Sequence, residues 1–183
     1  MNTPAPAPAQ AEAEAEVIYR GAHNGPSGAE AVWLENPDAP GQPTGILTPR
    51  TAAQHSHSPT GFSWGYAGSG PAELARAILV HALGDEGLCP TCQGALLIAV
   101  DYAAATDKLI ETPWRGDPAT APDNVIRCVE CDGTGTRVQP SLYQPFKFEV
   151  VALWPQDGPF TISRAEVLAW YRRHQETTGQ VGA

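Results

Sequence analysis

Long apolar runs and basic residues are both scarce in this chain of 183 residues. No segment approaches the roughly 20 consecutive apolar residues that a membrane-spanning helix needs, so we expect no membrane partner. Lys and Arg together number 11 against 20 Asp and Glu, which gives a formal net charge of −9. A uniformly basic nucleic-acid surface is therefore disfavoured, because phosphate binding needs clustered Lys and Arg.

The beginning of the chain lacks the features of an exported protein. Residues 1–16 carry neither the basic nor the apolar region of a secretory signal, so we expect a cytoplasmic location, in a host cell if the gene belongs to a phage. Their alternation of Pro with Ala, and then of Ala with Glu, predicts a disordered tail. At the other end, residues 177–183 are expected to form a flexible C-terminus.

Glycine and proline, with 18 residues each, divide the chain into short elements, of which two are predicted helices. Apolar side chains at helical spacing follow Pro71 and end before Gly84, which predicts a helix over 71–83. Ser163 and Glu166 have the spacing of a capping box, which predicts a second helix over 163–175.

Short runs of apolar and β-branched residues predict the strands. Residues 17–20 and 31–35 are expected to pair as a hairpin, and residues 96–100 to form a strand between the cysteines. Residues 146–153 alternate apolar and polar side chains before they turn fully apolar, which predicts a half-buried strand.

All four cysteines fall in two Cys-x-x-Cys pairs, and each pair is followed by Gly after one intervening residue. Each pair places two thiolates on one turn, at the separation of two vertices of a tetrahedral zinc ion. Because four cysteines leave no open position for a substrate, the site is predicted to hold one structural zinc ion. The predicted ligands are Cys89, Cys92, Cys128 and Cys131.

Disulfides are the alternative use of these cysteines. Disulfides within Cys-x-x-Cys are usually redox centres, and the chain lacks the βαβ context of thioredoxins, which favours zinc. The second pair, with Gly133 and Gly135 after it, resembles the zinc unit of J-domain chaperones, whereas Leu96 stands in place of the second glycine after the first pair. This resemblance implies a zinc ribbon, placed at 86–138, and does not imply a chaperone. The 35 residues between the pairs exceed those of a compact ribbon, so this interval is expected to be a loop that hangs from the ribbon.

A segment of alternating aromatic and small residues leads into the first predicted helix. Phe62, Trp64 and Tyr66 would project to one side of an extended strand, which predicts that they pack in the core. The glycines that follow precede a helix N-terminus, where free N–H groups can bind an anion, although neither nucleotide-binding fingerprint is present. The candidate binding residues of this alternative are Phe62, Trp64, Gly65, Tyr66, Gly68, Ser69 and Gly70.

The same segment carries a resemblance to a known family. Residues 58–75 read SPTGFSWGYAGSGPAELA, and Tyr143, Phe146 and Lys147 follow as Tyr-x-x-Phe-Lys. This pattern resembles an uncharacterised small-domain family of bacteria and phages. The resemblance implies a fold neighbourhood and a phage or mobile-element context, and it implies no activity. Members of that family have little between the two motifs, so the zinc ribbon is expected to be an insertion.

No catalytic set stands out in the sequence. His55 and His57 lie among polar residues and near a proline, which favours a solvated loop over a metal site or a general base. His81 could approach the cysteines from the first helix, but four cysteines already complete a tetrahedral site.

The predicted fold class is α+β, with a small, mostly antiparallel sheet packed by two helices and formed by residues 17–85 and 139–176. The predicted function is that of a non-enzymatic, zinc-stabilised binding or accessory protein with a protein or small-molecule partner. One alternative is a small-anion or nucleotide binder, or an enzyme, that uses the turn at 65–70. The other is nucleic-acid or protein binding through the ribbon, although residues 85–137 hold nine acidic and four basic residues, which argues against nucleic acid.

Overall fold

The computed structural model describes residues 16–23, 31–49 and 58–179. The predicted tail, apart from its last residue, lies outside the described residues, and so do His55, His57 and residues 180–183. Within the described part the fold is α+β, as predicted, with antiparallel sheets and three α-helices.

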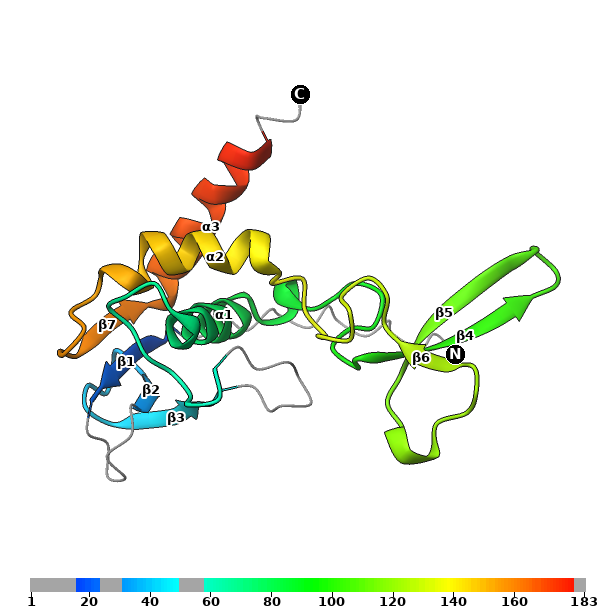
Figure 1. The fold of residues 1–183 in the computed structure, drawn as a ribbon, viewed down its shortest axis with the longest axis horizontal. Helices are drawn as coiled ribbons and strands as arrows, with labels where there is room; N and C mark the ends of the chain where they lie inside the picture. The colour runs from blue at the N-terminus through cyan, green and yellow to red at the C-terminus, as the bar shows by residue number, and fades with distance from the viewer. Residues whose placement is uncertain (1–15, 24–30, 50–57, 180–183) are drawn as a thin grey trace, which may run out of the picture.

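A four-stranded antiparallel sheet forms one layer of the larger part of the molecule (Figure 1). The predicted hairpin is confirmed, since Tyr19 of its first strand pairs with Leu34 of its second. The last strand, which the sequence analysis missed, pairs with the other edge of the first and places Ile162 opposite Tyr19. In spatial order the strands are β3 (Pro43–Leu47), β2 (Ala31–Glu35), β1 (Ile18–Ala22) and β7 (Phe160–Ser163).

Three helices, rather than the two expected, accompany this sheet. In Figure 1, α1 lies between the sheet and α2, and α3 rises beside them. Buried side chains of α1 meet the sheet on one side and α2 on the other, in a single cluster that includes Trp64 and Phe146. The helices are α1 (Ser69–Leu83), α2 (Pro140–Glu149) and α3 (Arg164–Gly179).

Local signals set the ends of α1 and α3 as the sequence predicts. The helix α1 ends at Leu83, and the next residue, Gly84, has a φ of 51° and begins the short 3-10 helix η2 (Gly84–Gly87). At the start of α3, the Glu166 N–H donates to Ser163 Oγ at 3.2 Å and the Ser163 N–H donates to Glu166 Oε2 at 2.8 Å, which confirms the capping box. The helix continues to Gly179, into the segment expected to be flexible.

The strand predicted over 146–153 is wrong. These residues form the second half of α2 and then the 3-10 helix η4 (Val151–Leu153). Tyr143 and Phe146 are buried in the main core, whereas Phe148 is 53% exposed. In a strand Phe146 and Phe148 would share one face, whereas the helix turns them to opposite sides, so that Phe146 packs into the core and Phe148 points to solvent.

The segment before α1 is an irregular loop, so the prediction of an extended strand of aromatic residues is also wrong. Phe62 and Trp64 are buried, and Trp64 Nε1 donates a hydrogen bond to the Gly158 carbonyl at 2.8 Å. Gly65 then takes a φ of 79°, which breaks the two-residue alternation, and Tyr66 emerges 43% exposed. The expected core role therefore holds for Phe62 and Trp64 and fails for Tyr66.

The cysteine-bearing segment forms an arm that projects from the C-terminal end of α1 and the N-terminal end of α2 (Figure 1). The strand predicted at 96–100 is confirmed, whereas the prediction of a loop between the cysteine pairs is wrong, because that interval contains a three-stranded antiparallel sheet. Buried residues of the arm form a second cluster that contains the cysteines and Ile98. The strands are β5 (Lys108–Trp114), β4 (Leu97–Ala103) and β6 (Val125–Arg127), and the 3-10 helix η3 (Pro118–Thr120) precedes β6.

No helix in the part of the chain that the structure describes is long and apolar enough to cross a membrane.

Candidate metal centre

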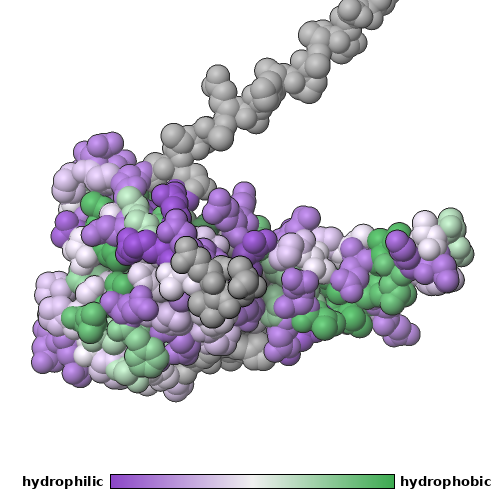
Figure 2. Space-filling view, turned by 90° about the horizontal axis from the view of Figure 1, so that it is seen from above, coloured by the Kyte–Doolittle hydropathy of each residue, from purple (hydrophilic) through white to green (hydrophobic). Residues whose placement is uncertain are grey.

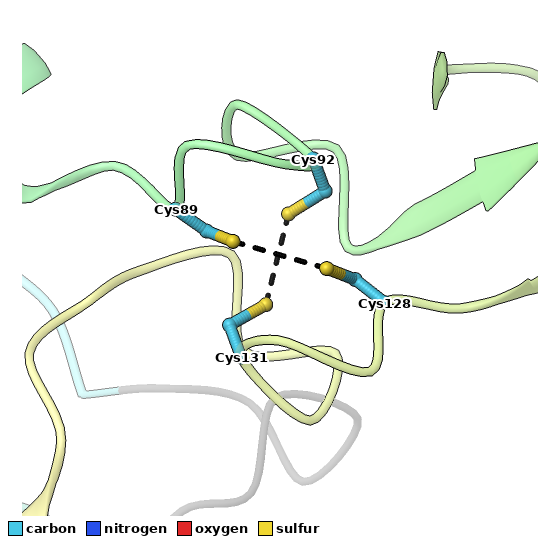
Figure 3. Close-up of side chains that lie close together, drawn as sticks. All are labelled: Cys89, Cys92, Cys128 and Cys131. Atoms are coloured by element: carbon cyan, nitrogen blue, oxygen red, sulfur yellow. Dashed lines mark hydrogen bonds between the residues drawn. The ribbon is translucent and has the colours of Figure 1, made fainter. Parts of the chain in front are cut away.

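The four predicted ligands converge on one point at the base of the arm (Figure 3). Cys89 and Cys92 lie in the turn that leads from η2 into β4, and Cys128 and Cys131 lie in the turn that follows β6. None of the four side chains is more than 2% exposed. We call the turns at 89–96 and 128–135 the first and second knuckle.

The sulfur atoms have the spacing of a tetrahedral metal site. Cys89 Sγ lies 3.8 Å from Cys128 Sγ, Cys92 Sγ lies 3.7 Å from Cys131 Sγ, and all four atoms lie within 4.8 Å of one another. Zinc–sulfur bonds of about 2.3 Å at tetrahedral angles place neighbouring sulfurs about 3.8 Å apart. A disulfide needs about 2.05 Å, and all four cysteines are unbridged. The donor set and its spacing therefore fit one tetrahedrally bound ion.

Left-handed backbone turns curl both knuckles around the sulfurs. Gln93 and Gly94 have φ values of 47° and 80°, and Asp132 and Gly133 have φ values of 50° and 63°. Two residues beyond each glycine the conformation recurs, at Leu96 with 69° and at Gly135 with 74°. The first knuckle thus adopts the backbone of the second, although Leu96 stands where the second has a glycine.

Reciprocal hydrogen bonds join the two knuckles. The Cys89 N–H donates to the Gly135 carbonyl at 3.0 Å, and the Cys128 N–H donates to the Leu96 carbonyl, also at 3.0 Å. The Gly135 N–H in addition donates to Cys131 Sγ at 3.3 Å. Because these bonds are exchanged pairwise, the two knuckles are related by an approximate two-fold axis through the centre of the four sulfurs.

The electrostatics of the centre favour a cation. Burial raises the pKa of the Cys128 thiol to about 12 and also raises the pKa of Cys92. For Cys131, burial acts in the same direction, but the Gly135 N–H and the neighbouring thiols outweigh it, so the pKa of Cys131 is lowered. Four thiolates cannot gather in this buried site without a positive ion, and a divalent metal supplies that charge.

The glycines of the aromatic segment are needed for close packing. A Cβ on Gly65 would lie 2.4 Å from Gln156 Cα, and a Cβ on Gly70 would lie 1.9 Å from Ser63 Oγ. A Cβ on Gly68 would lie 2.2 Å from Cε2 of the Tyr66 ring. The chain itself thus covers the start of α1, where Ser69 begins the helix. Anion binding by this turn remains a prediction, and the packing gives a sufficient reason for the glycines.

His81 has a structural role at the edge of the main core. Its Nδ1 lies 2.9 Å from the Tyr19 hydroxyl, and its ring meets the Tyr19 ring edge-on. Burial lowers the pKa of His81 and raises the pKa of Tyr19, so neutral forms of both are favoured. A cleft of about 420 Å³ separates α1 from the knuckles here, between Arg76 and His81 on one side and Leu96 and Gly135 on the other.

Three side chains beside the knuckles were missed by the sequence analysis. Trp114, Arg115 and Arg127 line a second cleft, of about 590 Å³, on the arm. The position of Arg127 directly before Cys128 is a signal in the sequence, but Trp114 and Arg115 become neighbours of the knuckles only through strand pairing.

Comparison with known proteins gives a family similarity. Residues 29–97 match the model of a family of unknown function (DUF6166). The matched segment spans well under half of the chain and includes α1, the aromatic-glycine segment that carries the expected resemblance, and Cys89 and Cys92. It ends before the second knuckle. No curated protein and no solved structure matches the chain.

Proposed function

We propose that this protein is a non-enzymatic binding or accessory protein whose arm is held together by one structural zinc ion. The observation that carries the proposal is the closed set of four buried sulfurs, with 3.7 and 3.8 Å between opposite knuckles. Four protein ligands occupy every vertex of a tetrahedral ion, so no vertex is left for a substrate. A metal bound in this way stabilises a fold and performs no catalysis.

The donor set supports zinc among the metals that cysteine binds. Soft thiolates in tetrahedral arrangement select zinc or iron. Sulfurs within 4.8 Å of one another surround a single ion and leave no room for an iron–sulfur cluster between them. Zinc has no redox chemistry, which suits a purely structural role.

The surface of the arm supports a binding role. Figure 2 shows hydrophobic side chains gathered along the arm. Tyr102 and Leu109 face each other across β4 and β5, and they are 63% and 68% exposed. Scattered apolar side chains are common on protein surfaces, but neighbouring ones on a projecting sheet are typical of interaction sites. An extended arm that buries little of its own apolar surface is suited to a protein partner.

A further part of the proposal is the biological context. The similarity over residues 29–97 supports a link to an uncharacterised family, and we propose that the protein acts in the cytoplasm of a bacterium, in association with a phage or mobile element. The anion-binding alternative at 65–70 has less support, because those glycines are explained by close packing.

The first prediction concerns the metal. Purified protein should contain about one zinc per chain by elemental analysis, since four thiolates complete one site. Cys128→Ser should lose the ion and unfold the arm, because the remaining buried thiols no longer form a closed site. The circular dichroism and melting temperature of the variant should then be insensitive to chelator.

Val129→Ser is the matched control, because Val129 is the next residue in the same knuckle and is 76% exposed. This variant should keep its zinc and its response to chelator. Metal-free protein with two disulfides, or protein that selectively retains iron, would contradict the proposal.

A further inference from the structure

The second cleft lies on one face of the arm, directly beside the metal centre. Leu97 is paired with Trp114 on β5 and with Arg127 on β6, and residues directly opposite in antiparallel strands point to the same face. Trp114, Leu97 and Arg127 therefore form one row across the three strands. Arg115 adds a second guanidinium, and the cleft of about 590 Å³ closes against Gly94 and Gly133 of the knuckles.

Each arginine of the cleft is held by one knuckle. Arg115 Nη2 donates to the Gln93 carbonyl at 2.8 Å, and Arg127 Nη1 lies 3.5 Å from Asp132 Oδ1. Gln93 and Asp132 occupy equivalent left-handed positions in the two knuckles. The side chain of Arg127 lies over Gly133, where a Cβ would come 2.4 Å from Nε. Strand pairing thus brings to the same cleft two arginines that contact equivalent positions of the two knuckles.

The charge and shape of the cleft are unusual for this protein. Its described lining includes two arginines and no carboxylate, although the chain carries a net charge of −9. The indole of Trp114 is half-buried, and Gly116 has no side chain to press on it, since a Cβ there would lie 2.4 Å from Cζ2. A flat apolar ring beside two guanidinium groups complements a flat aromatic ligand that carries an anionic group.

We propose that this cleft binds a nucleoside phosphate unit, with the base stacked on Trp114 and the phosphate between Arg115 and Arg127. The inference rests on the proposed function, because zinc holds the knuckles that position both arginines. The nine acidic residues in 85–137 repel a long phosphate backbone, so the site engages one or two phosphates and no more. The unit can come from a free nucleotide or from a single strand.

The second prediction tests this site with two probes, thymidine monophosphate and a fluorescent decathymidylate, after the zinc content of the protein has been measured. Zinc-loaded protein should bind decathymidylate saturably in fluorescence anisotropy, with a log–log salt slope no steeper than about −1.5. Trp114→Leu should weaken binding at least about tenfold, and Trp114→Phe should retain most of it, because stacking needs a flat ring. Arg115→Gln and Arg127→Gln should each weaken binding about tenfold.

Two further variants separate the cleft from general charge effects. Arg137→Gln makes the same charge change at an exposed arginine at the base of the arm, outside the cleft, and it should change affinity less than about twofold. Asp132→Asn removes the carboxylate that competes for Arg127, and Asn tolerates the left-handed backbone there, so binding should become several-fold tighter. Each variant is compared at equal zinc content and equal melting temperature.

The two probes also identify the source of the ligand. Displacement of decathymidylate by the mononucleotide supports a free nucleotide, and binding of the strand alone supports single-stranded nucleic acid. Zinc-loaded protein that binds neither probe overturns this inference and leaves the proposed function standing, whereas absence of zinc overturns the proposed function first. Equal loss in Arg137→Gln, or tighter binding of oligoglutamate than of either probe, also overturns the inference.

Discussion

Leu96 and Gly135 occupy equivalent positions of the two knuckles, and they show how one side chain constrains another. Both residues have a left-handed backbone, which costs a residue with a Cβ about 1–2 kcal/mol. The Leu96 side chain lies over Gly135, where a Cβ would come 2.7 Å from Leu96 Cδ2. With Leu96 in this conformation, a side chain at position 135 would displace the Leu96 methyl group. The glycine of the second knuckle thus leaves room for the leucine of the first.

The third prediction separates backbone strain from this steric conflict. Gly135→Ala should reduce the free energy of unfolding by about 2–4 kcal/mol, since it combines left-handed strain with overpacking. Gly41→Ala is the control, because Gly41 has a φ of 80° with nothing within 4 Å of the added Cβ, and it should lose only about 1–2 kcal/mol. In the Gly135→Ala background, Leu96→Gly should restore stability. Additive effects of the two changes in urea unfolding would contradict the contact.

At the scale of elements, Glu35 joins β1, β2 and the turn that follows β2. Its carboxylate accepts hydrogen bonds from Trp33 Nε1 at 2.8 Å and from the Gly41 N–H at 3.3 Å, and Arg20 Nε lies 2.8 Å away. The residue is 3% exposed. The Trp33 hydrogen bond is the largest of the interactions that lower the pKa of Glu35 below its ordinary value of 4.5. The ionised form is therefore the one that stabilises the sheet.

The fourth prediction follows from the sign of this shift. As the pH falls, Glu35 is protonated in the unfolded chain before it is protonated in the folded one. Its contribution to the free energy of unfolding is therefore complete above about pH 4.5 and is lost as the pH falls through the lowered pKa. Glu35→Gln should lower the melting temperature near pH 7, and the difference from the natural protein should shrink below pH 4.5. Glu111→Gln, at an exposed position on β5, should show a small difference at both pH values. A difference for Glu35→Gln that is independent of pH would contradict this account.

At the scale of the whole molecule, the buried residues form two clusters that meet at a narrow connection. The chain enters and leaves the arm side by side, because Leu88 bridges to Thr136 and the Arg137 N–H donates to the Gly87 carbonyl at 3.0 Å. Val138 belongs to the core of the larger part, so it lies inside the predicted ribbon of 86–138 but packs outside the arm. Residues 88–136 are the better definition of a removable arm.

The fifth prediction tests whether the arm is an independent unit. Replacement of residues 88–136 by a short Gly-Ser linker should leave a domain that unfolds cooperatively and no longer responds to chelator, because metal coordination supplies the folding energy of the arm. The linker joins residues 87 and 137, which already lie side by side, so closing it costs little conformational entropy. The family similarity extends to residue 97, and so includes the first knuckle. A molten or insoluble product would falsify the division into two units and would show that the knuckles complete the larger fold.

Helix ends and metal ligands were determined by the sequence itself, because both depend on residues close together in the chain. Ser163 and Glu166 cap a helix through contacts three residues apart, and a Cys-x-x-Cys turn presents two thiolates wherever it folds. Apolar runs at 31–35 and 96–100 likewise predicted strands, since their length and β-branched content leave few alternatives.

The tertiary structure decided features that the local sequence pattern leaves open or opposes. Phe146 and Phe148 have the two-residue spacing of a strand face, and packing in the shared core with α1 made that segment helical. Trp64 and Tyr66 have similar sequence surroundings, yet the left-handed turn at Gly65 buries one and exposes the other. The cleft of Trp114, Arg115 and Arg127 depends on pairing across three strands, which no spacing along the chain specifies.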